Sequence, residues 1–220
     1  LVIADNCATY VDYVWANYRT ESSSTLVLAA ILFAFQIYGD FSGYSDIAIG
    51  TARLFGIRLK DNFLVPYFSR NVAEFWKRWH ISLNTWFVDY VYIPLGGSRG
   101  SRWTTIRNTF IIFLLSGLWH GANWTYVTWG AYHALLFVPL IFLGRTKKYS
   151  TTATWKQIPK IGLTFALVTL GWIIFRAPNI EAAWLYIRYI FSPSLLTIPY
   201  VVDIKFYVPM ACSLIILIFV

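Results

Sequence analysis

The sequence predicts an all-α fold, a polytopic integral membrane helix bundle with broken or re-entrant helices and interfacial helices. Of its 220 residues, 58% are hydrophobic and only 13% are charged, whereas soluble domains carry about 25% charged residues. No Asp, Glu, Lys or Arg occurs in residues 108–144, and uncharged stretches of this length are typical of membrane spans. We expect one membrane-embedded domain over residues 1–220, crossing the cell's inner (plasma) membrane several times.

The basic residues are grouped beside the apolar stretches. Nine of the eighteen fall within residues 53–107 and five within 145–160, a pattern typical of cytoplasmic loops. The net charge of +8 therefore indicates contact with the lipid bilayer and its anionic headgroups rather than nucleic-acid binding. Because the chain starts at Leu1 and ends within an apolar run at Val220, we interpret it as an internal piece of a longer protein.

The first long apolar region consists of two pieces, residues 26–38 and 47–57, joined by the Gly-rich residues 39–46. Neither piece alone is long enough to cross a hydrocarbon core of about 30 Å. We expect them to form one span with a break or kink at the Gly-rich centre. Asp40 and Asp46 would then cap the two half-helices or form an ion or substrate site of the transporter type.

The next regions predict interfacial helices and then a helical hairpin. Basic and aromatic residues interleave within residues 58–107, as in helices that lie at the membrane interface. Residues 108–144 would measure about 55 Å as one helix, too long for one crossing, and both flanks are basic. We expect two helices separated by a break near residues 117–123. A further span is expected at 161–175, and the start of another at 206–220.

His120 lies near the centre of the uncharged stretch and is the main candidate for chemistry. An ionisable side chain at membrane depth is costly and usually functional. Burial favours the neutral imidazole, which accepts a proton from a hydroxyl and suits a general base. Trp119 and Trp124 are expected to form apolar walls around the ring. Asn123, one helical turn away, is expected to orient it. Gly117 and Gly121 bracket His120, which leaves room for a ligand or another backbone to approach.

The other two histidines have different expected roles. His133, in an apolar helix, is interpreted as a packing residue. For His80, an anchoring role and a role as a second active-site group both stay open. Because the sequence has neither zinc-binding spacing nor a covalent-nucleophile motif, we expect no metal and no tightly bound cofactor.

A series of short motifs makes the sequence more specific. In chain order they are residues 36–50 (QIYGDFSGYSDIAIG), Asn62-Phe63 with Pro66-Tyr67, 74–83 (EFWKRWHISL), Asp89-Tyr90 with 93–97 (IPLGG), 117–121 (GLWHG), Trp129-Gly130 with His133, and Gly171-Trp172 with 175–177 (FRA). In these motifs the chain resembles the membrane-bound O-acyltransferases, and within them the bacterial branch typified by the membrane subunit of alginate O-acetyltransferase. The resemblance covers roughly residues 26–190.

The resemblance implies a function and a pair of site residues. His120 matches the family's catalytic histidine, and His80 matches the second characteristic polar position. It also implies a channel between a cytoplasmic acyl thioester donor, acetyl-CoA as co-substrate, and an acceptor on the other side, with an extracytoplasmic acetyl-accepting partner protein. Val88 and Ala134 depart from the family's usual residues, which leaves the acceptor and partner surfaces open.

The leading interpretation is an O-acetyltransferase that acts on hydroxyls of an exported or cell-envelope polysaccharide, as in alginate biosynthesis. His120 is the general base, and Asn123 or His80 orients it or stabilises the developing oxyanion. One alternative is D-alanyl transfer to teichoic acid by the same fold. The other is a membrane transporter that uses Asp40 and Asp46, although such transporters usually contain two related halves and the sequence shows no internal repeat.

Overall fold

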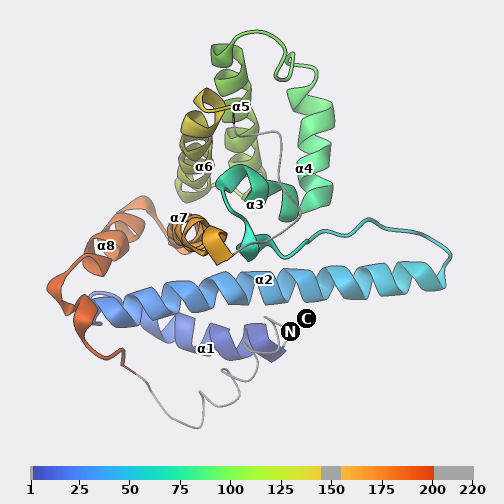
Figure 1. The fold of residues 1–220 in the computed structure, drawn as a ribbon. Coiled ribbons are helices and arrows are strands. Elements are labelled where there is room, and N and C mark those ends of the chain that lie inside the picture. Colours follow the sequence, from blue (N-terminus) through green and yellow to red (C-terminus); the bar gives the residue numbers. More distant parts are fainter. Residues whose placement is uncertain (1, 145–154, 201–220) are drawn as a thin grey trace. The chain divides into compact units, whose positions relative to one another are not determined.

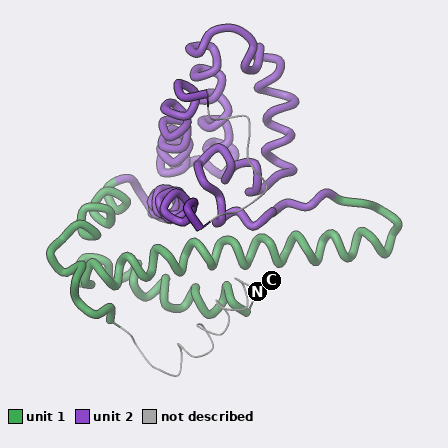
Figure 2. The backbone as a smooth tube through the Cα atoms, in the orientation of Figure 1, with its two compact units in different colours: residues 1–59, 181–220 green, residues 60–180 purple. Residues whose placement is uncertain are grey.

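The computed structural model describes residues 2–144 and 155–200. Within these ranges the chain forms eight α-helices and a few short 3₁₀ or π-helical segments, without a β-strand, so the predicted all-α class is confirmed. The chain divides into two compact units, residues 1–59 with 181–220 and residues 60–180 (Figure 2). That both belong to a single membrane-embedded domain stays a prediction.

The first unit consists of long helices and a short turn. Its elements are α1 (Val2–Ala16), α2 (Ser23–Leu54), almost all of α8 (Ile180–Ile190), and the 3₁₀ turn η4 (Pro193–Leu196) (Figure 1). α2 begins with a side-chain cap, because the Ser22 side chain accepts a hydrogen bond from the Thr25 amide. α8 is joined to α2 by the Tyr186 hydroxyl, which donates to the Leu26 carbonyl at 2.9 Å.

The break expected at residues 39–46 is absent, and that prediction is wrong. α2 continues as one α-helix of 32 residues. Each glycine inside a helix costs only about 1 kcal/mol relative to alanine, whereas an unpaired backbone group in an apolar medium costs several. Helix therefore persists through the Gly-rich segment. Asp40 and Asp46 lie in mid-helix with exposed side chains, so neither caps a half-helix.

The second unit combines short helices with a hairpin and one further long helix. Its elements are η1 (Pro66–Phe68), α3 (Val72–Arg78), α4 (Ile81–Phe87), the π-helical η2 (Val88–Tyr92), α5 (Arg102–His120), α6 (Trp124–Phe142), η3 (Trp155–Gln157) and α7 (Ile158–Arg176). Residues 58–107 thus contain several short helices, and their location at the membrane interface stays a prediction. α5 and α6 lie side by side and α3 lies against them (Figure 1).

The hairpin predicted within residues 108–144 is confirmed, with its break at the predicted place. α5 ends at His120 and α6 begins at Trp124. Gly121 follows α5 with a φ of +152°, a conformation that residues with a Cβ rarely adopt. Asn123 caps α6, because its side-chain oxygen accepts a hydrogen bond from the Thr125 amide at 3.1 Å.

Two glycines allow the hairpin helices to approach each other closely. A Cβ placed on Gly117 would overlap the carbonyl oxygen of Tyr126, and one on Gly130 would overlap the carbonyl oxygen of Phe113. Small residues commonly let membrane helices approach in this way. Of the two expected uses of the room at Gly117, approach of another backbone is the one observed.

Replacing Gly130 with alanine should destabilise the hairpin. The added methyl would meet backbone rather than a movable side chain, and overpacking of this kind costs roughly 1–3 kcal/mol. Gly162→Ala is the matched control, because a Cβ there meets nothing within 4 Å. We expect Gly130→Ala to lower the melting temperature of the full-length protein in detergent and Gly162→Ala to leave it unchanged or slightly raised. Equal melting temperatures would contradict the close helix contact.

Three of the described helices are long and apolar enough to cross a membrane, namely Ser23–Leu54, Trp124–Phe142 and Trp155–Arg176. The last contains the span expected at residues 161–175. α5 is not among them; its first two turns carry Arg102, Arg107 and Asn108. The span expected to start at residue 206 lies outside the described residues.

Candidate functional site

His120 lies in a cluster of aromatic rings contributed by three helices. Its imidazole meets Trp119 of α5 and Phe175 of α7 at 5.0 Å between ring centroids. Two rings of α6 complete the cluster, Trp129 at 5.4 Å and Tyr126 at 6.1 Å. The side chain remains partly exposed, so an apolar environment holds the ring while leaving part of it accessible.

The predicted neighbours of His120 are only partly those observed. Trp119 does form a wall, but Trp124 is 73% exposed, and its place is taken by Tyr126, Trp129 and Phe175. Asn123 uses its side-chain oxygen to cap α6 and donates its amide to the Pro178 carbonyl at 3.1 Å. Its observed contacts therefore fix the turn beside His120.

His80 lies in a sharp turn between α3 and α4. Its φ of +46° places it in the left-handed region, which is uncommon for residues other than glycine and costs conformational energy. The Asn84 side chain stabilises this turn by donating to the carbonyls of Trp76 and Trp79. The Ile81 amide donates to the Asn62 carbonyl at 3.0 Å. These bonds hold His80 in a defined position.

The structure brings His80 and His120 to the same region of the second unit. The Trp119 ring contacts both, at 6.3 Å from His80 and 5.0 Å from His120. Burial first, and then the repulsion that a protonated His120 would exert, lower the pKa of His80 to about 4. His80 is therefore a neutral imidazole at neutral pH, able to donate one hydrogen bond and accept another.

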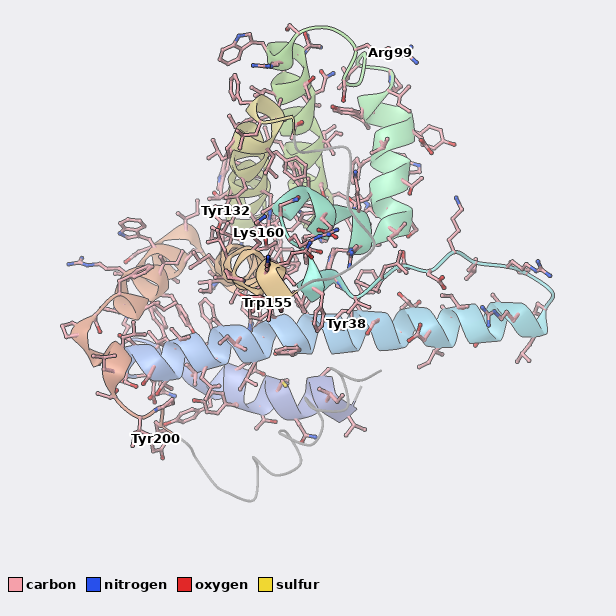
Figure 3. The ribbon with its side chains drawn as sticks, viewed as in Figure 1. Tyr38, Arg99, Tyr132, Trp155, Lys160 and Tyr200 are labelled. Carbon is pink, nitrogen blue, oxygen red and sulfur yellow. The ribbon has the colours of Figure 1, made fainter. Side chains whose placement is uncertain are left out.

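His133 is fully buried in α6, in agreement with its interpretation as a packing residue. Its Nδ1 accepts a hydrogen bond from Trp76 Nε1 at 3.2 Å. The contact between α3 and α6 therefore includes a hydrogen bond between side chains. Next to it, Tyr132 (Figure 3) donates its hydroxyl to the Leu167 carbonyl of α7 at 2.8 Å. α6 is thereby bonded to both α3 and α7.

α3 carries a buried charge cluster that the sequence did not predict. Glu74 is 1% exposed and receives hydrogen bonds from Arg70 Nε and Nη2, both at 2.9 Å, and from Arg78 Nη2 at 2.6 Å. Burial acts to raise the pKa of Glu74, but the hydrogen bonds and charges of Arg70 and Arg78 outweigh it and lower the pKa below 4.5. Arg70 and Arg78 thus both pair with the one carboxylate of Glu74.

A cavity of about 410 Å³ lies within the second unit, between the short helices and the hairpin. Its walls include Trp76 and Lys77 of α3, Asn84 of α4, and Phe113 of α5. Trp76 and Phe113 also contact the His133 ring, at 5.0 and 6.1 Å between centroids. Two of the cavity's lining residues thus also contact His133, which does not itself line the cavity.

The remaining predicted site residues lie elsewhere. Asp40 and Asp46 belong to α2 in the first unit, and the histidines belong to the second. Within residues 2–144 and 155–200, no three His, Cys, Asp or Glu side chains gather closely enough to hold a metal ion. Tyr126, Trp129 and Phe175 had no predicted role; Trp129 and Phe175 lie in the recognised motifs, but only tertiary packing shows that they surround His120.

The family is decided by comparison with known proteins. Residues 3–184 match the family described as MBOAT, membrane-bound O-acyltransferase family. The chain belongs to the membrane-bound O-acyltransferase family. The resemblance stated from the motifs is confirmed, and with the apolar helices it identifies a membrane protein.

Several curated members of the membrane-bound O-acyltransferase family are similar to this chain. The "Probable alginate O-acetylase AlgI" of Pseudomonas aeruginosa is 45% identical over 190 residues, which cover 86% of this chain and 36% of that protein. The peptidoglycan O-acetyltransferase of Helicobacter pylori is 40% identical, with 83% and 34% covered. The teichoic acid D-alanyltransferase of Bacillus subtilis is 35% identical, with 65% and 39% covered. The chain thus spans about a third of the length of these relatives.

Proposed function

We propose that this chain is part of a membrane O-acetyltransferase that transfers acetyl groups to hydroxyls of an exported or cell-envelope polysaccharide. The observation that carries the proposal is the placement of His120, partly exposed at the turn between α5 and α6 and in contact with four aromatic rings. The named activities of the alginate and peptidoglycan relatives support acetyl as the group and polysaccharide as the acceptor class.

In the proposed reaction His120 is the general base. Its neutral imidazole takes the proton of the acceptor hydroxyl while the hydroxyl oxygen attacks the carbonyl carbon of an acyl thioester. The carbon–sulfur bond then breaks, and the imidazolium returns the proton to the departing thiolate. His80 is the candidate donor to the developing oxyanion, because the Trp119 ring contacts both His80 and His120, at 6.3 and 5.0 Å between centroids.

The acyl donor is a substrate of this proposal, with acetyl-CoA as the candidate. The cavity between the short helices and the hairpin offers space for its thioester arm, with hydroxyl and amide groups of Asn84, Thr85, Ser98 and Thr109 among its lining residues. Trp76 separates this cavity from His133. His80 and His120 are not among the residues that line this cavity, so the proposal places only the donor's arm there. The donor enters from the side of the basic loops, which the positive-inside rule places in the cytoplasm.

The cellular setting follows from the same proposal. The full-length protein crosses the inner membrane several times, and its acceptor lies on the opposite side from the donor. An extracytoplasmic partner protein accepts the acetyl group and passes it to the polysaccharide, or the polysaccharide hydroxyl reacts directly.

The test is the ester content of each envelope polysaccharide in cells with and without the full-length protein. We expect loss of O-acetyl esters from one polymer, which would also identify the acceptor. Ester-linked D-alanine is measured in the same samples, because its loss with intact acetyl esters would favour the reaction named for the Bacillus subtilis relative. If both ester classes stayed unchanged on every polymer, acyl transfer would be ruled out, and ion-coupled uptake in Asp40→Asn and Asp46→Asn variants would be measured next.

A further inference from the structure

His133 is the most completely enclosed polar ring near the candidate site. Its side chain is 0% exposed, and Trp76 Nε1 donates to its Nδ1 at 3.2 Å. A neutral imidazole that accepts at Nδ1 carries its proton on Nε2. The hydrogen bond from Trp76 therefore selects one tautomer and one orientation of the His133 ring.

The His133 ring touches every helix that surrounds it. The Phe113 ring of α5 stacks on it at 6.1 Å with an interplanar angle of 22°. On the side of α7, a Cβ placed on Gly171 would lie 2.7 Å from His133 Nε2, so the imidazole occupies the space that the glycine leaves open. The His133 ring of α6 thus contacts residues of α3, α5 and α7.

The His133 ring is connected to His120 through one residue, Trp129, which contacts both imidazoles. Trp129 meets the edge of His133 at 5.1 Å, Trp76 at 5.5 Å and His120 at 5.4 Å between centroids. A shift of His133 or Trp76 would therefore move Trp129, and Trp129 forms one wall of the His120 site. Because packed interiors transmit small displacements, the orientation of His120 depends on this contact series.

We propose that His133 is a positioning residue for His120, acting through its hydrogen bond with Trp76 and its contact with Trp129. The inference rests on the proposed general-base role of His120. A phenyl ring at position 133 is similar in shape to the imidazole but slightly larger, and it would leave the buried Trp76 N–H without its acceptor. Removing that N–H as well would relieve the conflict. A purely structural role predicts changes in stability alone, whereas a positioning role predicts that kcat per folded protein falls in His133→Phe and recovers in the double variant.

The test compares His133→Phe, Trp76→Phe and the double variant in the full-length protein in native membranes. A displacement of about 1 Å at a reacting group can cost on the order of 100-fold in rate, so we expect His133→Phe to lower kcat roughly 10- to 100-fold with KM almost unchanged. The double variant should recover most of this loss. The proposal is overturned if kcat stays unchanged in His133→Phe, or if the double variant is no better than His133→Phe.

A second pair of variants tests the same ring from α7. Gly171→Ala places a methyl against His133 Nε2, whereas Gly162→Ala on the same helix meets nothing within 4 Å. We expect kcat to fall roughly tenfold or more in Gly171→Ala and to stay unchanged in Gly162→Ala. Loss of kcat only in proportion to loss of folded protein would show a structural role and overturn the proposal.

A readout independent of acyl transfer separates this inference from the proposed function. Diethyl pyrocarbonate modifies accessible imidazoles, and mass spectrometry follows the rate at His120. We expect His133→Phe to change that rate severalfold and the double variant to restore it. A wild-type protein without acyl-transfer activity would refute the proposed function alone. An unchanged modification rate in His133→Phe would refute the positioning role.

Discussion

Replacing His120 with alanine is expected to lower the rate of acyl transfer roughly 100- to 10,000-fold, the usual contribution of a general base, while the protein remains folded. The aromatic rings around His120 would still contact each other, since Trp129 meets Phe175 at 5.3 Å and Tyr126 meets Phe175 at 5.0 Å. The loss should therefore be one of chemistry. The measurement is the initial rate of acetyl transfer from a thioester donor, in membranes with matched protein abundance.

Leu118→Ala provides the control for this experiment. Leu118 lies in the same turn of α5 but is 56% exposed, so its truncation should leave the rate within about twofold, as for most surface changes. A His120→Ala protein that retained near-normal activity would show that another group is the base. An equal loss in Leu118→Ala would instead indicate general sensitivity of the hairpin turn.

Replacing Glu74 with glutamine should lower the free energy of unfolding by roughly 3 kcal/mol. Breaking a buried ion pair costs about 3–5 kcal/mol because the remaining charge is left without a partner. The lower end applies here, because the Arg78 and Arg70 side chains are 30% and 13% exposed and keep part of their hydration. The measurement is the unfolding of the full-length protein in detergent, by heat or by denaturant.

Glu181→Gln is the matched control, because Glu181 is exposed on α8. Its effect should stay within about 0.5 kcal/mol. The pH dependence adds a second check. Since the folded pKa of Glu74 lies below its ordinary value of 4.5, its stabilisation is complete above that value and is lost as the pH falls through the folded pKa. If Glu74→Gln unfolded like the wild type at pH 7, the cluster would contribute no stability.

The hairpin turn at His120 was predictable because its signals are local. A 37-residue uncharged stretch between basic flanks is too long for one crossing, and Gly121 and Asn123 are residue types that end and cap helices. Each of these effects acts within about one helical turn. For the same reason the sequence identified His120 itself, and the family motifs around it identified His80.

Local signals misled at α2. Gly39, Asp40 and Gly43 are typical of turns in a soluble protein, and they predicted a break. The structure has a continuous helix, because backbone hydrogen bonds in an apolar environment outweigh the propensity of individual residues. Residue type alone therefore does not decide whether a Gly-rich segment ends a membrane helix.

The sequence by itself determined the all-α membrane class, the family and the position of the hairpin turn, and it indicated His120 and His80 as candidate site residues. Only the tertiary structure decided what surrounds them. Phe175 meets His120 across 55 residues, and Trp76 bonds to His133 across 57. The physical reason is that caps and turns depend on neighbours within a few residues, whereas the contacts of an imidazole in a core depend on how separate helices pack.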